Sequence, residues 1–321
     1  MGQGQEVKTR PEPQVEIQER GEIFFFYRPK VNKEEAHSPD EVQRLYIVLR
    51  PESGERPIEE KQDPHSGKEG SKNKSQTQTS SSTSNQGGHG SQEVNIEKQP
   101  LLRLIVMGKK SFPDPAKRST PYWGYVELVT TRIKDINTTL KGEEYETSTR
   151  GHRHKPAASA LGEGIYRILR HNPDKRMHTH LIYKLELPPE NKKSEPQESL
   201  NIEREGSFLI QIKNPDDHRQ QSASASHFRG LQNKRKATFP AHLQGQFGHK
   251  LYSPADPPDF LNYEGCEFLL IAASDDIEEE LGLDLKTEEC ESSDKSCSDL
   301  VETFGETTTY STKPLFEGTW A

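Results

Sequence analysis

The pattern of hydrophobic and polar positions predicts strands along most of the chain. In RLYIVLR (44–50), Leu45, Ile47 and Leu49 alternate with the other side chains and share one face. EIFFFYRPKV (22–31) is apolar on both faces, which predicts a strand that is buried on two sides. Further apolar or alternating runs predict strands at residues 101–107, 122–131, 144–149, 178–187, 207–213 and 266–273.

Two helices are predicted. Over residues 157–171, Leu161, Ile165 and Ile168 recur at helical spacing after Pro156, and Asn172-Pro173 ends the segment. Gly162 and Gly164 inside this segment suggest close packing of the helix against a sheet. A short acidic helix is expected at 275–281, capped by Ser274 and ended by Gly282.

Many predicted strands, short polar connections and one long helix favour a mainly β, α+β fold. We expect an antiparallel sandwich or partly open barrel with one packed helix. Only 29% of the residues are hydrophobic and the mean hydropathy is −0.97, so part of the chain must lie outside a core. The predicted division is a single domain (20–51 plus 99–286), a disordered start (1–19), a low-complexity insertion (52–98) and an acidic disordered tail (287–321).

Charge is distributed unevenly. Residues 274–321 carry a net charge of −11, so the rest carries +3 of the total of −8. The tail either keeps the protein soluble or covers the basic body in cis. The chain has three cysteines, no N-terminal apolar run and no apolar segment of ~20 residues, so we expect a cytoplasmic protein without disulfides.

A basic segment directly precedes the predicted long helix. Free backbone N–H groups at a helix start, together with cationic side chains, could hold a phosphate or carboxylate. The alternative is that these side chains are solvated or paired with Glu143, Glu144 and Glu146. The candidate anion-binding residues are Arg150, His152, Arg153, His154 and Lys155.

A second basic cluster comprises Arg229, Lys234, Arg235 and Lys236. It could contact an anion or direct nuclear import, although charges in a polar turn often serve solubility alone. We expect no nucleic-acid partner, because the chain is acidic overall and carries no RNA-binding signature. The long aperiodic stretch 240–264 is either a binding element or a cover over a sheet edge.

Two His-x-His pairs, His152/His154 and His178/His180, are candidate metal ligands or general bases. Residues two apart on a strand share a face, so each pair could act together. The alternative is that His178 and His180 are surface residues of a half-exposed strand. We found no established catalytic motif and predict no cofactor.

The chain ends in KPLFEGTWA, in which Phe316 and Trp320 are four residues apart. On a short helix these two side chains could dock into a groove of a partner. The alternative is that the segment folds back onto its own domain.

Several segments resemble an uncharacterised plant protein family whose members are often labelled as BTB/POZ-domain proteins. They include GEIFFFYRPKV, PYWGYVELVTT, GHRHKPAASALGEGIYRIL and PPDFLNYEGCEFLLIAASDDIEEELG. The resemblance covers most of the predicted ordered chain and implies no activity or ligand. A BTB/POZ domain would imply a helix-rich dimer that binds a ubiquitin-ligase scaffold, whereas we expect a monomer without that partner.

The sequence therefore favours a β-rich binding module for an anionic ligand or a protein partner. In this hypothesis the basic segment 150–155 and the region 229–264 form one polar site. The alternative is an enzyme of metal or phosphoester type that uses the four histidines.

Overall fold

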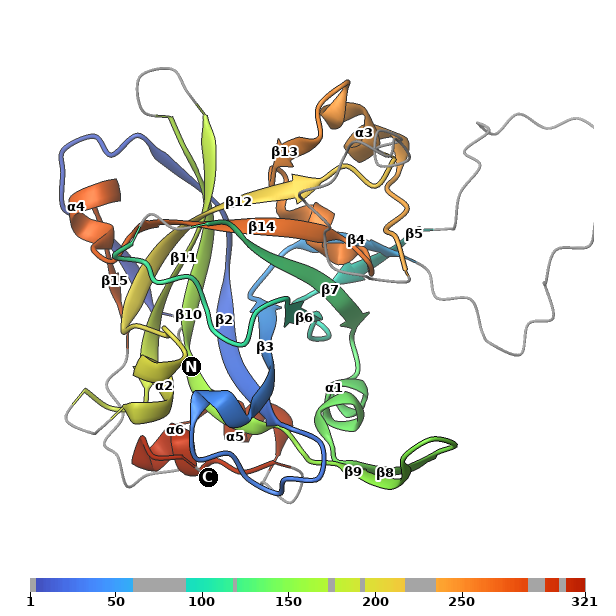
Figure 1. Cartoon of the computed structure of the whole chain (residues 1–321). Coiled ribbons are helices and arrows are strands. Elements are labelled where there is room, and N and C mark those ends of the chain that lie inside the picture. Colours follow the sequence, from blue (N-terminus) through green and yellow to red (C-terminus); the bar gives the residue numbers. More distant parts are fainter. Residues whose placement is uncertain are drawn as a thin grey trace, which may run out of the picture.

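Eight antiparallel strands close into a barrel in the computed structural model (Figure 1). Pairing of β12 with β11 closes the ring. The structure describes residues 4–59, 91–117, 120–172, 177–190, 194–216, 235–287, 298–305 and 310–320. In order around the barrel, the strands are β11 (His178–Leu187), β10 (Ser159–His171), β2 (Val15–Pro29), β3 (Val42–Pro51), β6 (Leu102–Met107), β7 (Tyr122–Thr130), β14 (Glu267–Ser274) and β12 (Glu205–Lys213).

Short elements surround the barrel. The additional strand pairs are β1 (Gln5–Lys8) with β15 (Leu283–Lys286), β4 (Glu55–Glu59) with β5 (Ser91–Asn95), β8 (Glu143–Thr147) with β9 (Gly151–Lys155), and β13 (Tyr252–Pro254) with β12. The helices are α1 (Ile133–Leu140), α2 (Glu195–Ser199), α3 (Ala241–Gln244), α4 (Ile277–Leu281), α5 (Asp299–Phe304) and α6 (Lys313–Glu317). The 3-10 turns are η1 (Pro39–Glu41), η4 (Gly245–Phe247) and η5 (Pro258–Asn262). No helix in the described ranges is long and apolar enough to cross a membrane.

The two faces of β2 pack into different clusters, which explains its unbroken aromatic run. Ile23 and Phe25 point into the barrel, where the largest buried cluster joins side chains from all eight strands. Phe24 and Phe26 point outward into a second cluster, which α1, α5 and α6 help to cover. The predicted mainly β, antiparallel fold is thus confirmed, and so is the prediction of a strand buried on both faces.

The inside of the barrel is a packed core. Phe112, from the segment after β6, reaches into it, and its ring centroid lies 4.7 Å from that of Phe208 and 5.7 Å from that of Phe25. The rings of Tyr183 and Phe208 stack with an interplanar angle of 2°. A barrel of eight strands has an interior that inward-facing side chains can fill in this way.

The prediction of a long helix over residues 157–171 is wrong, because residues 159–171 form strand β10. It pairs with β2 on one side and β11 on the other, and irregularities after Ala160, Glu163 and Ile168 break its register. Each irregularity shifts the alternation of inward and outward positions. Because β10 is also buried on both faces, its apolar residues recur without a period of two.

Gly164 permits the close approach of two strands, not of a helix to a sheet. A Cβ atom at this position would lie 2.1 Å from the carbonyl oxygen of Lys184 on β11. The second predicted helix is present as α4 and ends at Gly282, whose φ is 66°. Its N-cap is Asp276, which accepts a 2.7 Å hydrogen bond from the Glu279 N–H, and not Ser274.

The predicted disorder of residues 1–19 and 287–321 is also wrong over the described ranges. Residues 5–8 form β1, and β2 begins at Val15. Near the other end, α5 and α6 cover the outside of the barrel with Leu300, Phe304 and Leu315. Within the predicted insertion 52–98, residues 55–59 and 91–95 form a strand pair, and residues 60–90 lie outside the described part.

A buried polar network lies within this apolar structure. Arg103 has no exposed surface and makes a two-fold contact with Glu19, at 2.5 and 2.9 Å. Its Nε also donates to Asn262 Oδ1 at 2.8 Å, and the Tyr166 hydroxyl donates to Glu19 at 2.8 Å. The network ties β2, β6, β10 and η5 together.

Candidate functional site

The basic segment 150–155 belongs to a hairpin and not to a helix start. β9 carries these residues and pairs with the acidic strand β8, with Glu143 opposite Lys155 and Glu144 opposite His154. Lys155 Nζ lies 3.5 Å from Glu143, and His152 lies 3.6 Å from Glu144. The predicted anion site at a helix N-terminus is therefore wrong, and the alternative of pairing with neighbouring glutamates is confirmed for Lys155 and His152.

The two His-x-His pairs do not converge. His152 and His154 lie on the β8–β9 hairpin, whereas His178 and His180 start β11, beside the far end of the long strand β10. The ring that comes close to His180 belongs to His171, with 5.3 Å between ring centroids. Among the described residues, no group of three or more His, Cys, Asp or Glu side chains could hold a metal ion.

His180 is buried and not a surface residue of a half-exposed strand. It is 2% exposed, its Nδ1 lies 2.9 Å from Ser207 Oγ, and Glu280 of α4 lies 3.9 Å away. Burial and the neighbouring His171 lower the pKa of His180 to about 3, so the ring is neutral at neutral pH. The sequence pattern did not predict this burial, because α4 and β15 cover the outer face of β11 only in the folded chain.

The second basic cluster is partly described. Arg229 and Lys234 lie outside the described residues. Arg235 pairs with Glu264 and, at 3.0 Å, with Glu59. The region after Arg235 lies beside β13 and α3, while the basic hairpin lies below α1, at the other end of the molecule (Figure 1). The predicted single polar site made of both stretches is therefore not formed by their described parts.

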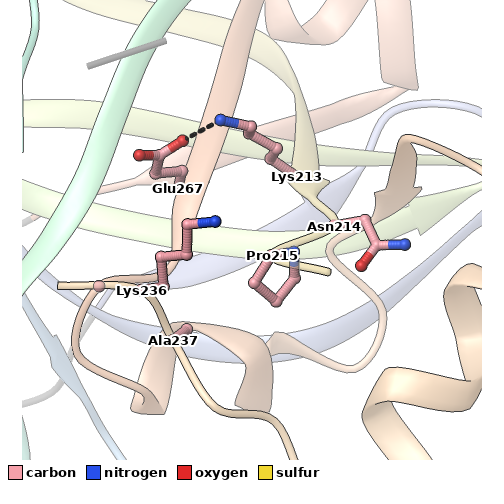
Figure 2. A pocket seen from close by; sticks show the side chains of 7 residues that line it. Lys213, Asn214, Pro215, Lys236, Ala237 and Glu267 are labelled. Carbon is pink, nitrogen blue, oxygen red and sulfur yellow. Dashed lines mark hydrogen bonds and ion pairs between the residues drawn. The ribbon is translucent and has the colours of Figure 1, made fainter. Parts of the chain in front are cut away.

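Lys236 lines a small pocket at the end of β12 (Figure 2). Lys213 Nζ and Glu267 Oε2 form an ion pair of 2.6 Å at its edge. The cavity volume is about 30 Å³, which is room for one or two water molecules and not for a larger ligand. The other lining residues are Asn214, Pro215, Ala237 and Gly265.

Phe316 and Trp320 pack on their own barrel. Phe316 is 9% exposed within the outer cluster. The Trp320 ring lies 5.5 Å from that of Tyr27, against the inner core. The alternative of a segment that folds back is therefore the one that the structure adopts.

A much larger hollow lies on the outer face of β3, β6 and β7. We call it the outer groove; its volume is about 550 Å³. The neighbouring α1 and the β8–β9 hairpin form its rim. Lys155 is the only sequence-predicted candidate among the lining residues, which are Arg28, Val31, Gln43, Arg44, Tyr46, Val106, Tyr125, Glu127, Thr139, Glu143, Tyr145 and Lys155.

The buried Arg28 connects the elements that line the outer groove. It is 1% exposed and donates from Nη2 to the carbonyl oxygen of Thr139 at 2.8 Å and from Nη1 to that of Lys141 at 3.2 Å. It also donates to the carbonyl oxygen of Pro156 and, at 3.1 Å, to the Tyr46 hydroxyl. Arg28 therefore fixes the end of α1 and both strands of the hairpin relative to the barrel.

The groove presents aromatic rings beside charges of both signs. Tyr46 of β3 and Tyr125 of β7 both lie opposite Val106 of β6, one on each side of it, and Tyr145 comes from the hairpin. Burial and nearby Glu127 raise the pKa of Tyr125, although Arg44 opposes the shift. The lining residues include no His, Cys or Ser side chain, but they include the ionisable side chains of Glu127, Glu143 and Lys155.

No family model, curated protein or solved structure matches this chain significantly.

Proposed function

We propose that this chain is a binding module that takes a segment of a protein partner in the outer groove. The observation that carries the proposal is the composition of the groove, in which three tyrosines lie beside Arg44 and Lys155. Tyrosine and arginine dominate the binding energy at protein interfaces, where aromatic rings supply contact area at little cost in side-chain entropy.

Charge balance favours a peptide over a simple anion. The groove lining includes Glu127 and Glu143 as well as Arg44 and Lys155, and Lys155 already lies 3.5 Å from Glu143. A small anion would meet repulsion from these two carboxylates. A peptide with groups of both signs could instead satisfy each side of the groove.

Selection from a displayed library of random 12-residue peptides tests the proposal. Clones enriched on the full chain should bind Tyr125→Ala and Tyr145→Ala about 10- to 100-fold more weakly, as expected for interface tyrosines. Tyr252→Ala is the matched control, because Tyr252 is half-buried and lies outside the groove lining. Failure to enrich any clone, or equal affinity for wild type and the groove variants, would refute the proposal.

A further inference from the structure

Helix α5, near the C-terminal end of the chain, lies on the outer face of the barrel above two buried carboxyl groups. Leu300 and Phe304 pack into the outer cluster, and the Phe304 ring lies 5.2 Å from that of Phe24. Asn137 of α1 donates to the Phe304 carbonyl oxygen at 3.1 Å. Residues 298–305 are thus held by apolar contacts and by a few specific polar ones.

Glu163 of β10 is the first of the two carboxyl groups. It is 1% exposed, and its Oε2 accepts from the Ser298 hydroxyl at 2.8 Å and from the Leu300 N–H at 2.9 Å. The charged or titratable groups that face it are Asp299 of α5, Glu186 of β11 and Tyr310. The hydrogen bonds from Ser298 and Leu300 lower the pKa of Glu163, whereas burial and the two neighbouring carboxyl groups raise it.

Glu22 of β2 is the second carboxyl group. It is 5% exposed and pairs with Arg50 of β3 at 2.9 Å. Arg50 in turn donates to Thr303 Oγ1 at 2.5 Å, so the same arginine serves the barrel and α5. Asp299 and Glu302 of α5 and the N-terminal amino group also act on Glu22.

Two buried carboxyl groups of the barrel, Glu22 and Glu163, therefore lie under α5 close to its own acidic residues Asp299 and Glu302, and Arg50 pairs with Glu22. Glu302 is exposed and Asp299 is half-buried, whereas Glu22 and Glu163 are buried. We propose that residues 298–305 form a pH-sensitive latch, whose docking on the barrel weakens as Glu22 and Glu163 become ionised.

The direction of the effect follows from linkage. Burial raises the pKa of Glu22 to about 7, with Asp299 and Glu302 adding to the shift and Arg50 opposing it. Burial likewise raises the pKa of Glu163 to about 8, with Asp299 and Glu186 adding to the shift and the hydrogen bonds from Ser298 and Leu300 opposing it. When the latch is released, both groups return to the usual glutamate value near 4.5. Docking is therefore strongest below pH ~4.5 and is lost progressively as pH rises through 7 to 8, about tenfold per pH unit for each carboxyl group.

Release of the latch would expose apolar surface that is continuous with the groove. Phe24, Phe26 and Val48 under the C-terminal segment belong to the same cluster as Tyr46 and Val106 of the groove. The latch thus gives the protein a way to enlarge the apolar face beside its groove when pH rises. This inference does not depend on the proposed peptide binding.

Hydrogen exchange measured by mass spectrometry on the full chain tests the latch. Protection factors of the amides at 300–304, corrected for intrinsic rates, should fall at least tenfold per unit between pH 5 and pH 7. In Glu22→Gln/Glu163→Gln this slope should vanish, because a glutamine oxygen still accepts the hydrogen bonds from Ser298 and Leu300 but does not ionise. Glu278→Gln, an exposed change on α4, should keep the wild-type slope.

Two results would overturn the inference. One is wild-type protection at 300–304 that does not change with pH. The other is a double variant in which protection at 300–304 falls with pH as steeply as in wild type. Protected amides in β3 would show that the barrel of this variant is folded. If the double variant does not fold, the wild-type titration alone decides. Ser298→Glu, which places a further carboxyl group beside Glu163, should lower the protection at 300–304 at pH 7 relative to wild type.

Discussion

Neutralising Glu19 should destabilise the protein strongly. In Glu19→Gln, the fully buried Arg103 keeps its charge but loses the carboxylate that contacts it at 2.5 and 2.9 Å. Removing one partner of a buried ion pair costs about 3–5 kcal/mol, because the other charge stays buried without compensation. Asn262 remains as a neutral partner at 2.8 Å, so we expect the lower part of that range.

Urea unfolding followed by circular dichroism measures this cost. Arg132→Gln removes an exposed ion pair with Asp135 and should leave the midpoint within error. The double variant Glu19→Leu/Arg103→Met removes both charges and should recover most of the lost stability. A cost below ~1 kcal/mol for Glu19→Gln, or a double variant no better than the single one, would refute the reasoning.

The same variant has a predicted pH dependence. Burial alone would raise the pKa of Glu19, but the charge and hydrogen bonds of Arg103 outweigh it and lower that pKa below its usual value of 4.5. The carboxylate therefore stabilises the fold above pH ~4.5, and this contribution is lost as pH falls through the lowered folded pKa. The difference in stability between wild type and Glu19→Gln should shrink in the same acid range.

Two further substitutions test the packing. Gly164→Ala should lower the free energy of unfolding by at least ~2 kcal/mol, because the added Cβ would overlap the carbonyl oxygen of Lys184. Gly245→Ala should leave the stability unchanged in thermal unfolding, because the space around this glycine is open. Trp320→Ala should lower the free energy of unfolding by about 2 kcal/mol, because the ring loses its contact with Tyr27. Leu251→Ala, at a side chain that is 37% exposed, should leave the melting temperature unchanged. Equal effects of the two substitutions would contradict the packing of Trp320 on the barrel.

Local sequence patterns correctly predicted the inner face of strand β3 and the glycine that ends helix α4. Leu45, Ile47 and Leu49 share the inner face of β3 as alternation predicts, because the side chains of a strand point to opposite sides. The acidic α4 ends at Gly282, since glycine adopts a positive φ without strain. α1 was missed, although Ile136 and Leu140 show helical spacing and are both buried.

The candidate site was less accessible to sequence reasoning. Tyr46, Tyr125 and Tyr145 are far apart in the chain and meet only because β3, β6 and β7 are neighbours and Arg28 anchors the hairpin beside them. Of the residues selected for their charge, Lys155 alone reaches the groove lining. Basic residues attract attention in a sequence, but Glu143 and Glu144 sit opposite them once the hairpin forms.

The chain alone therefore specifies a β-rich protein, the inner faces of several strands and the short acidic helix, since these depend on contacts between near neighbours. Folding in three dimensions converts 159–171 into a strand, closes the barrel through β11 and β12, and brings α5 down over Glu22 and Glu163. Each of these outcomes depends on which distant segment lies on the second face of an element. That partner is set by long-range packing, which no local periodicity records.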